Sequence, residues 1–260
     1  MIKIYNEDCL ETMSKGHIER ESVDIVITSP PYNNSRTCHT DKCIQQNTCR
    51  YAEYDDNKTN EEYCSWMVDI FNGYDRILKK DGVVLFNVSY GGENPNVMFE
   101  MLHSVYSNTN FMIADIICWK KQSALPNNVT KNKLTRIWEP VFVFCRKNEY
   151  DTFKCNKTVS SYSSVGQPFY NIMFNFIQAP NNDGSNDLNK ATFSKGLVLQ
   201  LLEMYVPDKN GVVVYDSFMG TGTTAVACKD FGVDCIGSEI SKQQCDFAND
   251  RINQTQKSLF

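Results

Sequence analysis

One segment of the chain reads Val212-Val213-Val214-Tyr215-Asp216-Ser217-Phe218-Met219-Gly220-Thr221-Gly222-Thr223. Its first four residues form a continuous apolar run, which is typical of a strand covered on both faces of a sheet. Gly220 and Gly222 then allow the backbone to turn tightly and to approach a ligand closely. A helical pattern begins at Thr223, so the segment predicts a strand, a loop and a helix in succession. Ligands of open α/β sheets bind at the carboxyl ends of such strands.

The residues around this loop indicate a nucleoside-type cofactor. Neither the full dinucleotide fingerprint nor the Gly-Lys-Ser/Thr ending of a phosphate loop is present. Asp216, at the end of the strand, suits a cationic or hydroxylated ligand. Glu239 follows the next predicted strand, 23 residues beyond Asp216, which is close to the spacing at which an acid reaches ribose hydroxyls. A purely structural turn is the alternative interpretation of the glycines alone.

Other apolar runs predict the remaining strands of the sheet. They lie at Ile2–Tyr5, Val23–Thr28, Val83–Val88, Met112–Trp119, Val141–Cys145 and Val233–Gly237, beside Val212–Tyr215. Strands that alternate with helices predict the α/β class, with a doubly wound and mostly parallel sheet. A chain of 260 residues suits one large domain, which we expect to span residues 1–260.

Helical patterns lie between the predicted strands. In Glu61–Lys79, apolar residues recur at three- to four-residue spacing, and the basic pair Lys79-Lys80 followed by Asp81-Gly82 predicts its end. A second helix is expected from about Ser194 to Tyr205, and a third after Gly222.

A second informative segment reads Thr28-Ser29-Pro30-Pro31-Tyr32-Asn33 and also follows a predicted strand. Two successive prolines fix an extended backbone, so that acceptor atoms there are preorganised. The Ser29 hydroxyl and a backbone carbonyl can accept hydrogen bonds from the two N–H groups of an exocyclic base amine. Tyr32 offers a flat face to an extruded base. Such acceptors help the delocalised amine to pyramidalise and to attack an activated methyl group. A proline-stiffened turn is the alternative.

The composition, with 42% hydrophobic and 22% charged residues, is that of an ordinary globular protein. No apolar run approaches the roughly 20 residues that cross a bilayer, and the amino terminus lacks the pattern of a signal peptide. We therefore expect no membrane partner and a cytoplasmic protein. The 11 cysteines, odd in number and scattered along the chain, are then expected as free thiols.

The net charge of −5 at first argues against a nucleic-acid partner, because the phosphate backbone favours cationic surfaces. The charges are unevenly distributed, however. From Cys118 to Lys147 there are seven bases and one acid, which give a net charge of +6. A solvated surface is the alternative explanation of this window. The bases that we take as candidate DNA contacts are Lys120, Lys121, Lys131, Lys133 and Arg136.

These segments together resemble the amino-methyltransferases of DNA, the N4-cytosine and N6-adenine enzymes of bacterial and viral restriction–modification systems. Ser29-Pro30-Pro31-Tyr32 is similar to their catalytic motif, and Asp216–Thr223 to their loop for S-adenosylmethionine. Asn6-Glu7-Asp8-Cys9-Leu10 resembles the segment whose acid contacts the adenine of that cofactor. The catalytic residues that the resemblance implies are Ser29, Pro30, Pro31 and Tyr32. The implied cofactor-binding residues are Asp8, Cys9, Asp216, Phe218, Gly220, Gly222, Thr223 and Glu239, and no metal is implied.

The catalytic segment precedes the cofactor loop in this chain. That order corresponds to the family's β arrangement, a circular permutation of the usual methyltransferase domain, and implies a Rossmann-like sheet of seven strands with one antiparallel strand. The resemblance also implies double-stranded DNA as substrate, a homodimer and a cognate restriction endonuclease. Serine at the first position of the catalytic motif is more typical of N4-cytosine enzymes, and aspartate of N6-adenine enzymes. Cytosine N4 is therefore the expected target, with adenine N6, and then RNA or a protein amide, as alternatives.

Two polar stretches fit no strand or helix, and we expect them to be functional loops. Residues 34–60 are predicted to be a DNA- or target-binding loop, and residues 148–190 a short target-recognition insertion. Zinc is an alternative role for the first stretch, which contains Cys38, His39, Cys43 and Cys49, although these lack a Cys-x-x-Cys pair. Thr192-Phe193-Ser194-Lys195 departs from the family pattern before the cofactor loop, so no cofactor contact is assigned to Ser194 or Lys195.

Overall fold

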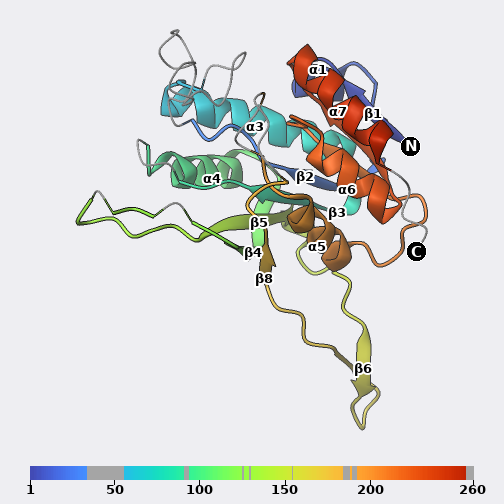
Figure 1. Ribbon diagram of the computed structural model, residues 1–260. Coiled ribbons are helices and arrows are strands. Elements are labelled where there is room, and N and C mark those ends of the chain that lie inside the picture. Colours follow the sequence, from blue (N-terminus) through green and yellow to red (C-terminus); the bar gives the residue numbers. More distant parts are fainter. Residues whose placement is uncertain are drawn as a thin grey trace.

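The computed structural model describes residues 1–33, 56–90, 94–124, 126–128, 130–153, 155–183, 188 and 192–255. Within them, one large sheet has the strand order β1-β10-β9-β2-β3-β5-β4-β8 (Figure 1). Its strands are β1 (Ile2–Tyr5), β2 (Val23–Thr28), β3 (Leu78–Asn87), β4 (Phe111–Lys121), β5 (Trp138–Arg146), β8 (Phe176–Ala179), β9 (Val213–Asp216) and β10 (Asp234–Ser238). The helices are α1 (Cys9–Ser14), α3 (Asn60–Ile77), α4 (Val97–Asn108), α5 (Lys195–Tyr205), α6 (Thr223–Phe231) and α7 (Lys242–Gln254), with a short 3-10 turn η1 (Lys147–Glu149).

The sheet is mostly parallel, as the sequence predicts. Strands β1, β10, β9, β2 and β3 pair in parallel, whereas β5 runs antiparallel to both of its neighbours, β3 and β4. The predicted α/β class and the single antiparallel strand are therefore confirmed. The predicted number of seven strands is wrong, because β8 adds an eighth strand, parallel to β4. Its residues Ile177 and Ala179 are buried, which stabilises this short strand at the edge of the sheet.

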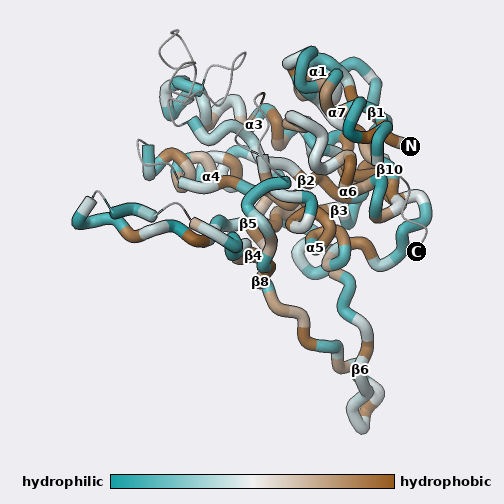
Figure 2. Tube along the Cα trace, in the orientation of Figure 1, coloured by the Kyte–Doolittle hydropathy of each residue, from teal (hydrophilic) through white to brown (hydrophobic). Residues whose placement is uncertain are grey.

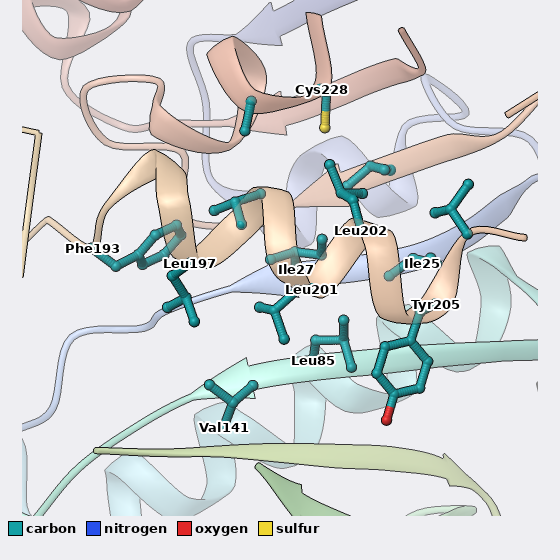
Figure 3. Packing of buried hydrophobic residues seen from close by; sticks show 14 of the residues in the cluster. Ile25, Ile27, Leu85, Val141, Phe193, Leu197, Leu201, Leu202, Tyr205 and Cys228 are labelled. Carbon is teal, nitrogen blue, oxygen red and sulfur yellow. The ribbon is translucent and has the colours of Figure 1, made fainter. Parts of the chain in front are cut away.

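Helices cover both faces of the sheet, and each face has its own hydrophobic cluster. Along β2, Ile25 and Ile27 point into the cluster under α5 and α6, whereas Val26 points into the cluster under α1, α3 and α4. Figure 3 shows Leu201 and Leu202 of α5 lying over the side of β2 that carries Ile25 and Ile27. Continuous apolar runs in the central strands follow from this arrangement, since every residue of such a strand is buried on one face or the other.

The end of α3 differs from the prediction. The helix ends at Ile77, and Leu78 already belongs to β3, where it pairs with Val23 of β2. The last carbonyls of α3 accept hydrogen bonds from the backbone amides of residues 21 and 22. Lys79 then turns to the side of β2, where its ammonium group binds the Asp24 carboxylate at 2.7 Å. These contacts outweigh the basic-residue and glycine signals that favoured a later end.

Two segments project from the body of the molecule (Figure 1). One is the connection between β4 and β5. The other, which we call the arm, comprises residues 155–175 and carries the hairpin of β6 (Val159–Tyr162) and β7 (Pro168–Tyr170). Hydrophobic residues extend along the arm toward β6 in Figure 2, and several are more than half exposed: Tyr162, Val165, Phe169, Tyr170, Ile172 and Phe174. None of the helices in the described part of the chain combines the length and hydrophobicity needed to span a membrane.

Candidate active site

The carboxyl ends of four neighbouring parallel strands open on one cavity of about 600 Å³. This volume lies within the range of small-molecule sites, and the position is the one at which open α/β sheets bind ligands. The walls include residues that directly follow each strand: Glu7, Asp8 and Cys9 after β1; Ser29 and Pro31 after β2; Ser217–Thr221 after β9; and Glu239–Ser241 after β10. The topology thus brings together the two segments that the sequence singles out.

The glycine loop after β9 adopts a backbone that side chains disfavour. Gly220 has φ of 53° and Gly222 has φ of 84°, both in the left-handed region. A Cβ on Gly222 would lie 2.7 Å from the Cβ of Ala248 in α7, so glycine is also required there for space. The amide of Gly220 donates to the Glu239 carboxylate at 2.8 Å, which ties the loop to the end of β10.

Asp216 lies behind this loop and is not among the residues that line the cavity. Its carboxylate accepts hydrogen bonds from the Thr28 hydroxyl at 2.7 Å, the Thr224 hydroxyl at 2.6 Å and the amide of Phe218 at 3.0 Å. Burial raises the pKa of Asp216, and these three hydrogen bonds oppose that rise. Asp216 therefore holds the end of β2, the glycine loop and α6 together, and any effect it has on a ligand passes through them.

Glu239, Asp8 and Cys9 line the cavity at the ends of β10 and β1. The second oxygen of Glu239 accepts a hydrogen bond from the amide of Ser241 at 2.9 Å, so the carboxylate is oriented by amides on both sides. Asp8 caps α1 and accepts from the amide of Leu10 at 2.7 Å. Burial raises the pKa of Cys9, so its thiol stays protonated. Phe218 and Thr223 also line the cavity.

The segment after β2 contributes Ser29 and Pro31 to the cavity wall, whereas Pro30 is not among the residues that line it. The Ser29 hydroxyl lies 3.2 Å from the Tyr32 hydroxyl, which itself donates to Oδ1 of Asn87 at 3.2 Å. The carbonyl of Pro31 accepts a hydrogen bond from the Tyr63 hydroxyl at 2.8 Å, which fixes the segment against α3. Tyr32 packs partly against the core and is not among the cavity-lining residues, so its predicted stacking on a base stays a prediction.

The basic residues chosen from the sequence separate into two groups. Lys120 and Lys121 lie on β4, and Lys121 forms an ion pair with Glu139 at 2.5 Å. Lys131, Lys133 and Arg136 lie on the exposed connection between β4 and β5, and the Arg136 guanidinium stacks on the ring of Tyr90. The other two bases of the positive window are used inside the protein: Arg146 binds Asp75 and Glu149, and Lys147 binds backbone carbonyls of residues 106 and 109. The positive window is thus not one continuous surface.

Several residues of the site were not selected from the sequence, among them Asn87, Trp66 and Lys58. Asn87 ends β3 beside the catalytic segment. It lies one residue before the end of the predicted strand Val83–Val88, and a polar residue within that apolar run is the signal that could have found it. Trp66 fits the apolar face of the helix that contains it, yet it also lines the cavity and meets Phe218 edge-on at 5.5 Å between ring centroids. Lys58 lines the cavity too, with its ammonium group 5.8 Å from the centroid of the Trp66 ring.

The predicted loop at residues 34–60 lies mostly outside the described residues, since the structure describes only residues 56–60 of it. Its cysteines and His39, which suggested zinc as an alternative, fall outside them as well. Within the described residues no group of three or more His, Cys, Asp or Glu side chains is placed to hold a metal ion.

A doubly wound sheet with a glycine loop and a Ser-Pro-Pro-Tyr segment on one cavity is the arrangement of methyltransferases that use a nucleoside-type cofactor. A family model described as "DNA methylase", for the N6 and N4 enzymes, matches residues 23–250. The chain therefore belongs to the N6/N4 family of DNA methylases, as the sequence predicts. It is a DNA amino-methyltransferase, and its cofactor is S-adenosylmethionine.

Individual relatives agree with this assignment. The orphan methyltransferase M.BamHII of Bacillus amyloliquefaciens is 25% identical, over 92% of this chain and 91% of its own. The type II methyltransferase M.SmaI of Serratia marcescens is 24% identical, over 90% and 86%. Among solved structures, the cytosine-N4-specific PvuII DNA methyltransferase superposes with a TM-score of 0.66 at 18% identity, covering 98% of this chain and 94% of its own. The M1.HpyAVI–SAM complex gives a TM-score of 0.61 at 21% identity, covering 97% and 100%.

The residues of the cavity fit this cofactor. The Glu239 carboxylate, oriented by two amides, suits the hydroxyls of a ribose, and the apolar side chains of Phe218 and Ile240 suit a purine ring. Asp8 adds an acceptor for an amino group on that ring. The cofactor, with its positive sulfonium and ammonium groups, also matches a wall that carries several carboxylates.

Proposed function

We propose that the protein methylates N4 of cytosine in double-stranded DNA, on a base extruded from the helix into the cavity. The observation that carries this proposal is the position of Ser29. Ser29 lines the same cavity as the glycine loop, and the hydrogen-bonding neighbours of its hydroxyl, Tyr32 and Asn87, are neutral. A neutral hydroxyl acceptor is the form of the catalytic motif that is typical of the N4-cytosine enzymes.

S-Adenosylmethionine supplies a methyl group that is already activated on a sulfonium. The task of the protein is therefore to bind, orient and shield the reacting groups. Ser29 would accept a hydrogen bond from one N–H group of the base amine. This favours the pyramidal geometry in which the nitrogen lone pair can attack the methyl group. The hydrogen bond between Thr28 and Asp216 joins the strand before Ser29 to the cofactor loop, which keeps the two halves of the site in register.

Contacts with DNA are proposed for the two projecting segments. Lys131, Lys133 and Arg136 on the β4–β5 connection suit the phosphate backbone, which positions the protein without reading sequence. The arm and β8 occupy the insertion predicted for target recognition at residues 148–190, and we propose that the arm contributes to the choice of sequence. A homodimer and a cognate endonuclease are also proposed as partners, from the family resemblance.

The test is mass spectrometry of nucleosides from duplex DNA of varied sequence, after incubation with the purified protein and S-adenosylmethionine. We expect N4-methylcytosine, and none above background with Ser29→Ala. The matched control is Ser14→Ala, an exposed serine of α1 that does not line the cavity, and its product should remain N4-methylcytosine. N6-methyladenine from the wild-type protein would refute the choice of base, and no methylated base despite intact cofactor binding would refute DNA as the substrate. Sequencing of the methylated positions identifies the recognition site.

A further inference from the structure

We infer that Asn87 is a positioning residue that sets the direction of the hydrogen bonds around Ser29, so that the Ser29 hydroxyl faces the cavity as an acceptor. This inference rests on the proposed function, because it concerns the same base amine. It adds a property that the motif alone does not specify, namely the preference of the site for a base that carries an amino group over one that carries a carbonyl oxygen at the same position.

The orientation of the Asn87 amide is fixed from outside the site. Asn87 is the last residue of β3 and is 3% exposed. Its Nδ2 donates to the carbonyl oxygen of Pro140 in β5 at 3.0 Å. The opposite orientation of the amide would place two acceptor oxygens against each other, so the Oδ1 atom must face the catalytic segment.

The direction of the next hydrogen bonds follows from that orientation. Oδ1 is an acceptor only, and it lies 3.2 Å from the Tyr32 hydroxyl and 3.5 Å from the Ser29 hydroxyl. Tyr32 therefore directs its single proton to Asn87. The phenol oxygen can then accept the Ser29 proton across 3.2 Å, or Ser29 can donate to Oδ1 itself. In both cases the Ser29 proton is directed to a residue that does not line the cavity, and the lone pairs of Ser29 are left for a donor inside it.

This direction matters because a base amine offers two N–H donors and a delocalised lone pair. An inward-facing Ser29 lone pair attracts such a donor, whereas an inward-facing Ser29 proton would repel it. A carbonyl oxygen in place of the amine has the opposite requirement. The hydrogen bonds that run from Pro140 through Asn87 and Tyr32 to Ser29 thus favour cytosine over uracil or thymine. Apart from Ser29, the residues that make these bonds do not line the cavity.

The experiment compares the affinity of the protein for two duplexes that contain the recognition site found above. One carries cytosine at the target position and the other carries uracil, and both are measured with S-adenosylhomocysteine, which transfers no methyl group. The variants are Asn87→Leu, which removes the acceptor at similar size, and Asn87→Gln, which keeps both the donor and the acceptor of the amide. Asn87→Ala serves as a second acceptor-free variant if the leucine variant does not fold.

For the wild-type protein we expect a preference for cytosine of roughly tenfold, the worth of one well-made hydrogen bond in a site. Asn87→Leu should reduce this ratio toward one and lower kcat, with the KM for S-adenosylmethionine unchanged, whereas Asn87→Gln should retain most of the ratio. General damage to the fold would weaken both duplexes equally and leave the ratio intact, and that result would overturn the inference. If the first experiment yields N6-methyladenine, the proposed function fails separately, and adenine compared with hypoxanthine then tests Asn87 in the same way.

Discussion

Replacing Gly222 by alanine tests whether the cofactor loop depends on its close approach to α7. Gly222 has φ of 84°, and the added Cβ would lie 2.7 Å from the Cβ and 3.1 Å from the Cα of Ala248. The left-handed backbone costs an alanine about 1–2 kcal/mol. Overpacking against α7 adds about 1–3 kcal/mol, because a backbone atom as well as a side chain must move. The free energy of unfolding should therefore fall by about 2–5 kcal/mol.

Gly232→Ala is the matched control, since Gly232 lies at the other end of the same helix. Its φ is 90°, yet an added Cβ would meet no atom within 4 Å. The control thus has the cost of a left-handed alanine without the contact with Ala248. Both variants share the stabilisation that comes from the lower conformational entropy of the unfolded chain. Urea unfolding of the two variants should differ by about 1–3 kcal/mol, the cost of the contact alone.

Calorimetric titration with S-adenosylmethionine gives the functional side of the same test. Gly222→Ala should weaken binding, because α7 and the loop cannot both keep their positions around the new methyl group. Gly232→Ala should leave the affinity unchanged, since Gly232 lies at the opposite end of α6 from the cofactor loop and an added Cβ there would meet no atom within 4 Å. Equal losses of stability in the two variants, together with equal affinities, would show that α7 moves aside at little cost and would refute the reasoning.

Three further predictions concern the ionisable groups of the site and core. Glu239→Gln should lower the affinity for S-adenosylmethionine about 10- to 100-fold, because a charged acceptor shared by two backbone amides is replaced by a group that presents a donor to one of them; an unchanged dissociation constant in calorimetry would contradict this. Burial raises the pKa of Asp216 in the folded state, so the folded protein binds the carboxyl proton more firmly than the unfolded chain does. The contribution of this group to the free energy of unfolding therefore falls as pH rises from the ordinary pKa of an aspartate, about 3.9, through the raised pKa. Urea unfolding across this range should show the advantage of the wild type over Asp216→Asn shrinking with increasing pH, and a growing advantage would reverse the assigned sign. Burial raises the pKa of Cys145 and of Cys245 to about 11, so mass spectrometry should find both thiols unmodified after brief iodoacetamide treatment at pH 8, and both alkylated once the protein is unfolded.

The sequence was sufficient for the parts of the fold that depend on local pattern. Continuous apolar runs identify central strands, because burial on both faces leaves few positions for polar residues. The two segments at the ends of β2 and β9 could be placed on one cavity, since the carboxyl ends of parallel strands meet at one edge of the sheet. Glu239 was found by its spacing, and the structure places it on the cavity wall.

Features that depend on contacts between distant segments could not be found in this way. Strand β8 has only four residues, and it is stabilised by pairing with β4 and by the burial of Ile177 and Ala179 against distant segments. The end of α3 is set by Leu78 pairing with Val23, more than 50 positions earlier in the chain. The same holds for Asn87, whose orientation depends on the carbonyl of Pro140. Asp216 shows the converse, because its position at a strand end was evident while its three internal hydrogen bonds were not.

Strand β8 has a consequence for how such a protein can evolve. The arm leaves the sheet after β5 and returns to it at β8, and both of these strands pair with β4. The arm is held at one end by α5, through Asn156, and at the other by β4, through Asn175. A segment whose two ends are both held by the body of the molecule can lengthen, shorten or change its tip at small cost in closure entropy. The core and the cavity keep their geometry during such changes. Mutation can therefore explore new arms on an unaltered chemical centre. If the arm has the role in target choice proposed above, descendants can diverge in their targets while inheriting the same reaction.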